Sequence, residues 1–172
     1  GVHEIVVMSS SQVGKSEIEL NMMGQAIDND PGPMLYVQPT DSVAEDYSKR
    51  RIAPMISACP TLRQKIYRAK GRDSANTITM KLFPGGSLAI VGANSPSDLA
   101  SKPVRYIFFD EIDRFPLSAG TEGDPIKLAE RRTETYRHNR KIVKTSTPTI
   151  KGASKIEDAY MKGTQEEWRT EC

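Results

Sequence analysis

The first chemical signal is a stretch rich in serine that ends in Gly14-Lys15-Ser16 and follows the apolar run Glu4–Met8. This order is that of a Walker A loop, which lies between a strand and a helix and surrounds phosphate groups with backbone N–H donors. Lys15 would reach the β- and γ-phosphates of a nucleotide, and Ser16 would ligate Mg²⁺. The residues expected to bind nucleotide are Ser10, Ser11, Gln12, Val13, Gly14, Lys15 and Ser16. Ser9 stands where such loops usually have their first glycine, so a plain serine-rich turn is the alternative interpretation.

The second signal is a pair of adjacent acids, Asp110 and Glu111, directly after the apolar run Arg105–Phe109. A strand would carry both to the carboxyl edge of the sheet, where open α/β sheets bind ligands. Asp110 could then hold the magnesium shell, and Glu111 could polarise an attacking water as a catalytic base. Acids after a strand can also simply begin a solvated turn. Both motifs in one chain, in this order and each behind a strand, favour a nucleotide hydrolase with Lys15 and Glu111 as its catalytic residues.

A third candidate element is the hydroxyl run Thr145-Ser146-Thr147, which follows the apolar pair Ile142-Val143. Hydroxyls at a strand end could sense the γ-phosphate and pass its loss to neighbouring elements. Thr and Ser are also ordinary strand-end and turn residues, so this element is weak by itself.

The elements that must position these residues alternate between short apolar runs and longer segments of helical periodicity. This alternation predicts the α/β class, with a mostly parallel central sheet flanked by helices. The expected strands are Glu4–Met8, Met34–Gln38, Thr77–Leu82, Ser87–Gly92, Arg105–Phe109 and Lys141–Thr145. The expected helices are Lys15–Asp28, Ser42–Ile56, Thr61–Arg68, Asp124–Tyr136 and Ser154–Met161. Asp41 and Asp124 are expected to cap helices, and Pro84-Gly85-Gly86 to form a hairpin turn.

Composition limits the remaining possibilities. The 172 residues are 37% hydrophobic, enough for one core, so we expect one domain over residues 1–172. A net charge of +2 does not by itself indicate a nucleic-acid binder. Two cysteines and two histidines are too few for a disulfide framework or a zinc cluster, which is typical of a reducing cytosol. No apolar run approaches the roughly 20 residues that span a bilayer, so no membrane association is expected.

Four blocks together resemble the large terminase subunit of tailed phages, in its lambda-like (GpA) branch. They are the Walker A loop, Gly92–Leu99, Asp110–Pro116 and Thr145–Pro148. The resemblance covers nearly the whole chain and implies a RecA-like P-loop NTPase of the class with an additional strand between the Walker A and Walker B strands (ASCE). It also implies ATP and Mg²⁺ as cofactors and ATP-driven translocation of double-stranded DNA into a procapsid.

The implied partners are double-stranded DNA, the portal protein and procapsid, a small terminase subunit and further copies of the chain in a ring. The implied location is the host cytoplasm. In this family a nuclease domain follows the motor and an upstream segment contacts adenine. We therefore expect residues 1–172 to be a motor domain from a longer chain, a monomer in isolation and without nuclease activity.

Residue by residue, the resemblance assigns phosphate binding to Lys15, magnesium to Ser16 and Asp110, and the catalytic base to Glu111. It assigns the coupling motif to Thr145, Ser146 and Thr147. Two positions depart from the family pattern, because relatives carry an arginine where this chain has Ser11 or Ala100. The basic residues considered for action on a neighbouring subunit are Arg72, Lys102 and Arg105.

A basic stretch, residues 61–72, is a candidate DNA contact because it contains no acid. Its basic residues are Arg63, Lys65, Arg68, Lys70 and Arg72. Such a run can neutralise phosphates and give sequence-independent, salt-sensitive binding. A solvated surface is the alternative for this stretch.

Two other functions fit parts of the sequence. A helicase-type ATPase would share the acidic box and the hydroxyl motif, but it needs a second RecA-like domain for which 172 residues leave no room. A nucleotide-dependent binding module without hydrolysis would not need both Lys15 and Glu111.

Overall fold

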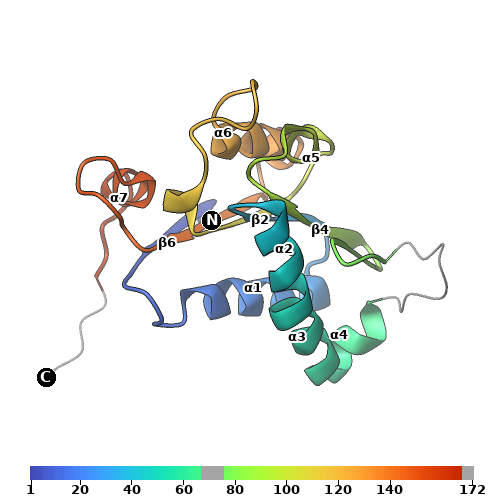
Figure 1. Ribbon diagram of the computed structural model, residues 1–172. Helices are drawn as coiled ribbons and strands as arrows, with labels where there is room; N and C mark the ends of the chain where they lie inside the picture. The colour runs from blue at the N-terminus through green and yellow to red at the C-terminus, as the bar shows by residue number, and fades with distance from the viewer. Residues whose placement is uncertain (67–75, 168–172) are drawn as a thin grey trace, which may run out of the picture.

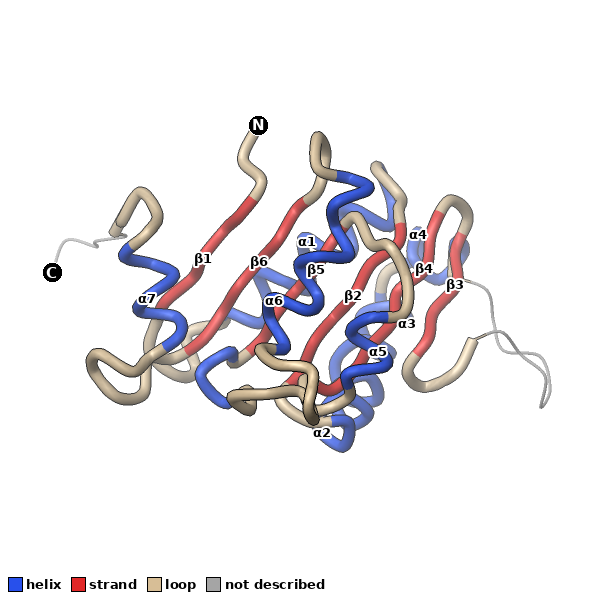
Figure 2. The backbone as a smooth tube through the Cα atoms, turned by 90° about the horizontal axis from the view of Figure 1, so that it is seen from above, coloured by secondary structure: helices blue, strands red, loops and turns tan. Residues whose placement is uncertain are grey.

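The computed structural model describes residues 1–66 and 76–167, and these form an α/β domain around one six-stranded sheet. The sheet has the order β1-β6-β5-β2-β4-β3, and its neighbouring strands are parallel except for the antiparallel pair β3 and β4. Figure 2 shows the strands side by side. Their bounds are β1 Glu4–Met8, β2 Pro33–Gln38, β3 Met80–Phe83, β4 Gly86–Gly92, β5 Tyr106–Asp110 and β6 Lys141–Ser146.

The position of β6 confirms the predicted RecA-like fold of the additional-strand class. β6 is the last strand in the chain, yet it lies between β1 and β5, which precede the two Walker motifs. A parallel insertion of this kind places the ends of β1, β6 and β5 at one edge of the sheet. The hydroxyl motif therefore lies between the two Walker elements.

Helices cover both faces of the sheet (Figures 1 and 2). Their bounds are α1 Lys15–Asn29, α2 Asp41–Tyr47, α3 Ala53–Ala58, α4 Pro60–Lys65, α5 Pro96–Ala100, α6 Pro125–Glu130 and α7 Lys155–Met161. Three segments have other helical forms, the π-helical η1 Ser48–Ile52 and the 3₁₀-helical η2 Ile112–Arg114 and η3 Arg131–Tyr136.

Two hydrophobic cores fill the spaces between these layers. On one face, Met23 of α1, Ile52 of η1 and Leu62 of α4 pack with side chains of the sheet. On the other face, Leu99 of α5, Leu128 of α6 and Ile156 of α7 do the same. Because both faces are covered, all five residues of β5 are buried, although the last of them is an aspartate.

The sequence predicted most element positions within one or two residues. Helix α1 begins at the expected Lys15, and the expected helix Ser42–Ile56 is present as α2, η1 and α3 in succession. The expected strand Thr77–Leu82 is shorter, since it begins at Met80. The expected helix Asp124–Tyr136 changes to a 3₁₀ helix after Glu130. Sequence analysis missed α5 and η2, which are too short for a periodic pattern.

The prediction for the start of α2 is wrong in detail. Thr40, not Asp41, caps the helix, because its hydroxyl accepts the N–H of Val43. Asp41 instead accepts the N–H of Gly92 at 2.9 Å and so joins α2 to the end of β4. Asp124 does cap α6 through the N–H of Ile126, as expected.

The hairpin between β3 and β4 forms as predicted, with Gly85 at a positive φ of 83°. Within the described ranges, no helix is long and apolar enough to cross a membrane.

Candidate nucleotide-binding site

The three candidate motifs meet at the carboxyl edge of the central strands. In the strand register, Met8 lies opposite Ser146 and Asp110 lies opposite Thr145. The loops that follow β1, β5 and β6 therefore emerge side by side, as the parallel arrangement requires. This edge is the candidate site.

The Walker A loop is exposed and connects directly to the N-terminus of α1. Gly14, which precedes the helix, has φ 88° and provides no side-chain cap, so the first N–H groups of α1 are not capped by a side chain. Gln12 also has a left-handed backbone, with φ 61°. The N-terminus of a helix with free N–H groups is a ready anion site, favoured further by the helix dipole. The end of the loop at Gly14 therefore leads into a helix N-terminus that is suited to binding a phosphate.

Lys15 is the central cation of the site. Its side chain is 7% exposed, and its ammonium lies 2.9 Å from Glu111 Oε1 and 2.9 Å from the hydroxyl oxygen of Thr147. Glu111, which follows β5, and Thr147, which follows β6, thus both contact the Lys15 ammonium in the loop-helix segment after β1. A phosphate held by Lys15 would lie within reach of both Glu111 and Thr147.

Glu111 has an unusual backbone conformation, with φ 58° and ψ 49°. A left-handed conformation costs a non-glycine residue roughly 1–2 kcal/mol, and such strain is common at functional sites. Of three non-glycine residues with positive φ in the described part of the chain, Gln12 and Glu111 are both in this site. The turn directs the Glu111 carboxylate to Lys15 on one side, while Nε of the exposed Arg114 lies 3.9 Å from its other oxygen. Sequence analysis did not identify Arg114.

Asp110 is held by hydroxyl and amide donors from three other elements. Ser16 of α1 donates to Asp110 Oδ2 at 3.1 Å, and Thr145 of β6 donates to Oδ1 at 2.9 Å. From β2, Tyr36 and Gln38 donate to Oδ2 at 3.2 and 3.1 Å. Asp110 as a whole is 3% exposed, and these four donors fix the orientation of its carboxylate.

The pairing of Ser16 with Asp110 suits Mg²⁺ at this position. Mg²⁺ prefers oxygen ligands, keeps several waters and commonly takes phosphate oxygens together with few protein groups. Within residues 1–66 and 76–167, no three His, Cys, Asp or Glu side chains gather into a metal-binding cluster. A hydroxyl with a carboxylate behind it, next to a phosphate loop, is a donor set of the kind that nucleotide-bound magnesium uses.

A buried acid that the sequence analysis missed lies behind Asp110. Glu19 is completely buried on the inner side of α1. Burial raises its pKa well above the usual value, and the nearby charge of Asp110 raises it further. The pKa of Tyr36 is also raised by burial and by the charge of Glu19. The ring of Tyr36 stacks on that of Tyr47, with 5.0 Å between the ring centroids. The spacing of Ser16 and Glu19, one helical turn, was the available signal for this residue.

The proposed coupling residues all contact the Walker elements. Thr145 bonds Asp110, Thr147 bonds Lys15, and Ser146 accepts the N–H of Asp113 at 3.2 Å. The hydroxyl run therefore lies against both motifs.

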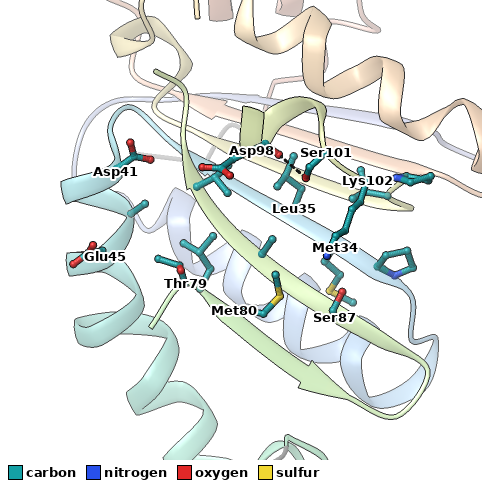
Figure 3. Close-up of a pocket in the computed structure, with 17 residues that line it drawn as sticks. Met34, Leu35, Asp41, Glu45, Thr79, Met80, Ser87, Asp98, Ser101 and Lys102 are labelled. Carbon is teal, nitrogen blue, oxygen red and sulfur yellow. Dashed lines mark hydrogen bonds between the residues drawn. The ribbon is translucent and has the colours of Figure 1, made fainter. Parts of the chain in front are cut away.

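The structure does not bring Lys102 or Arg105 to this edge, and Arg72 lies outside the described residues. Arg105 precedes β5, at the opposite end of the strand from Asp110, and its guanidinium pairs with Asp30 through two nitrogens, Nη1 at 2.8 Å and Nη2 at 2.5 Å. Lys102 lines a separate cavity of about 560 Å³ bounded by α2, α5, β2 and β4. Figure 3 shows Lys102 there with Asp98 and Ser101.

The candidate DNA-binding residues are only partly described. Arg63 is exposed on α4 and bonds the carbonyl of Ser57, whereas Lys65 forms an ion pair with Asp28 at 2.5 Å. Arg68, Lys70 and Arg72 lie outside the described residues.

Comparison with known proteins identifies relatives of this chain. Residues 1–172 match the family model of the phage terminase large subunit gpA, ATPase domain. The chain is 30% identical to the terminase large subunit of Enterobacteria phage P21 and 31% identical to that of Escherichia phage lambda. Each match covers 92% of this chain but only 25% of the relative, so the chain spans about a quarter of those proteins.

Solved structures of similar fold are also terminases. The large terminase of bacteriophage HK97 has a TM-score of 0.71 at 12% identity, over 94% of this chain and 33% of that one. The ATPase domain of the Thermus phage P74-26 large terminase has a TM-score of 0.63 at 15% identity, over 96% and 67%. The large terminase of another thermophilic bacteriophage, in complex with ADP, has a TM-score of 0.54 at 14% identity, over 85% and 33%.

Proposed function

We propose that this chain, which belongs to the gpA family of phage terminase large subunit ATPase domains, binds ATP with Mg²⁺ and hydrolyses it to move double-stranded DNA into a procapsid. The observation that carries the proposal is the convergence of Glu111 and Thr147 on the Lys15 ammonium, each at 2.9 Å. Lys15 for the phosphate, Glu111 for the attacking water and Thr147 for sensing the loss of the γ-phosphate are therefore in direct contact.

The residues divide the chemistry among them. Loop N–H groups and Lys15 bind and orient the phosphates, and the N-terminus of α1 adds its dipole. Glu111 holds a water and accepts its proton as the water attacks the γ-phosphorus, while the bond from the γ-phosphorus to the β–γ bridging oxygen breaks and ADP leaves. Magnesium, held by Ser16 with Asp110 behind it, would neutralise charge on the phosphate oxygens.

The Glu111 geometry distinguishes this function from a binding module without hydrolysis. Such a module needs Lys15 but has no use for a carboxylate on a strained backbone directed at the same nitrogen. Family membership favours a terminase motor over a helicase-type ATPase.

The partners are part of the proposal and are supported by family membership. They are double-stranded DNA, the portal protein and procapsid, a small terminase subunit and neighbouring copies in a ring, in the cytoplasm of the host. Because the chain spans about a quarter of its curated relatives, these partners are proposed for the full-length protein.

The test is ATP hydrolysis by the full-length protein with and without DNA and procapsids. We expect magnesium-dependent turnover that rises when both are present, accompanied by nuclease-protected DNA inside the capsid. Hydrolysis without any encapsidated DNA would reject the packaging assignment, and nucleotide binding without hydrolysis would reject the ATPase assignment.

A further inference from the structure

We propose that Asp113 is a positioning residue that clamps residues 147–156 to the Walker B turn, so that a change at Thr147 reaches helix α7. The inference rests on the proposed function of the hydroxyl motif. It concerns a residue that neither binds nucleotide nor belongs to that motif.

The Asp113 carboxylate accepts hydrogen bonds from two separate places in this segment. Oδ2 accepts the N–H of Thr149 at 2.9 Å and its hydroxyl at 3.0 Å, just after the motif. Oδ1 accepts the N–H of Ile156 at 2.9 Å, in the first turn of α7. Partial burial raises the pKa of Asp113, but bonds from Ile156, Ser154 and Thr149 outweigh that effect and the pKa lies below its usual value. The group is therefore an ionised acceptor that spans the segment.

The same residue is fixed to the site from its backbone side. Its N–H donates to the Ser146 hydroxyl at 3.2 Å, and it lies in η2, two residues after Glu111. One residue thus joins the base-bearing turn, the hydroxyl motif and the start of α7.

Helix α7 has a second attachment to the same turn. Lys155 donates to the carbonyl oxygens of Phe115 and Pro116 at 2.9 and 3.0 Å. Ile156 is fully buried in the core on this face. With its first turn fixed at both places, α7 can follow the Walker B turn as one body.

The path from the phosphate site to α7 is short. Thr147 contacts Lys15, and Thr149, two residues later, is held by Asp113. Only one residue separates Thr147 from Thr149, so a shift of Thr147 when the γ-phosphate leaves cannot be absorbed by a flexible loop between them. It must break the bonds to Asp113 or move the clamped segment, and the latter would displace α7.

The experiment uses full-length protein and compares Asp113→Asn with the parent. Nucleotide Kd, ATP turnover and base pairs of DNA packaged per ATP hydrolysed are measured together. We expect Kd to change by less than about twofold and packaged DNA per ATP to fall about fivefold, as for residues that carry coupling between sites. A residue that only supports the fold would lower turnover and packaging in proportion, leaving their ratio unchanged, and that outcome would overturn the proposal.

Two further variants sharpen the test. Asp158→Asn removes an exposed carboxylate of α7 that pairs with Lys162, and it should leave the ratio unchanged. Thr149→Val removes only the hydroxyl bond and should lower the ratio in the same direction but less. If Asp113→Asn does not fold, a Thr149→Val protein with the parental ratio overturns the proposal. A parent that hydrolyses no ATP would instead reject the proposed function.

Discussion

The Lys15 ammonium and the Glu111 carboxylate form an ion pair at 2.9 Å across the carboxyl edge of the sheet. The proposed phosphate-binding residue and the proposed base are therefore direct neighbours, although their motifs lie far apart in the sequence. A nucleotide phosphate that binds Lys15 would compete with Glu111 for the same cation. Substitutions of Glu111 and of Lys15 separate these roles.

We predict that Glu111→Gln binds ATP with Mg²⁺ but loses hydrolysis by roughly 10²- to 10⁴-fold, because the amide keeps the shape of the side chain and cannot accept the proton. Steady-state turnover and a nucleotide-binding titration check this result. Glu45→Gln is the matched control, since Glu45 is exposed and pairs only loosely with Lys49 at 3.4 Å. Turnover near the parental rate in Glu111→Gln would show that another group is the base.

Lys15→Ala should instead weaken nucleotide binding. A hydrogen bond to a charged group contributes about 1.5–3 kcal/mol, which corresponds to a rise of roughly 10- to 100-fold in Kd. Titration with a fluorescent ATP analogue measures this change, with the exposed Lys127→Ala as control. An unchanged Kd would place the phosphates away from Lys15.

Glu19 should make stability depend on pH. Burial and the charge of Asp110 raise its pKa in the folded chain above the ordinary value of 4.5. The folded state therefore binds more protons than the unfolded state, and this contribution to stability is lost as pH rises above 4.5 toward the folded-state pKa. Glu19→Gln keeps a neutral side chain at every pH, so its Tm relative to the parent should increase between pH 5 and pH 8. Tm curves of the variant and the parent that stay parallel over this pH range would show that ionisation of Glu19 does not lower the stability of the fold.

We predict that the isolated domain is a slow, largely monomeric ATPase whose rate rises more than linearly with protein concentration. An arginine supplied by a neighbour is worth on the order of 10³ to 10⁵ in rate in P-loop enzymes. Specific activity across a wide concentration range provides the test. A fast rate independent of concentration would indicate an arginine acting in cis, for which Arg114 beside Glu111 is then the first candidate.

The basic residue that acts on the neighbouring subunit can be sought by mixing. Alanine variants of Arg72, Lys102 and Arg105 are each combined with Glu111→Gln protein, which can donate but not hydrolyse. A variant that is slow alone at every concentration, but is stimulated by added Glu111→Gln protein, identifies the donor. Arg105 would first have to leave its two bonds to Asp30, and we therefore expect the smallest effect there.

Replacing Arg63, Lys65 and Lys70 with alanine should weaken non-specific duplex binding and flatten its salt dependence. Each lost phosphate contact lowers the salt slope by about one. Because Lys65 already pairs with Asp28, its single variant should change the slope least. Binding isotherms at several salt concentrations measure the slope, with the exposed Lys162→Ala as control. An unchanged slope would assign the stretch to a solvated surface.

The sequence by itself determined the fold class and the main residues of the site. Walker A and Walker B residues each follow an apolar strand, and parallel strands carry such residues to one edge whatever their order in the sheet. Lys15, Ser16, Asp110 and Glu111 could thus be predicted to meet, because short-range patterns encode both the strand and the residue that follows it.

Only the tertiary structure decided which side chains surround Asp110. Tyr36 and Gln38 reach it because β2 lies next to β5, and Thr145 reaches it because β6 lies on the other side. Strand order is set by packing across the whole sheet, not by local periodicity, so Tyr36 and Gln38 had no signal in the sequence as partners of Asp110. The burial of Glu19 and the clamp formed by Asp113 have the same origin, since each depends on an element distant in the chain.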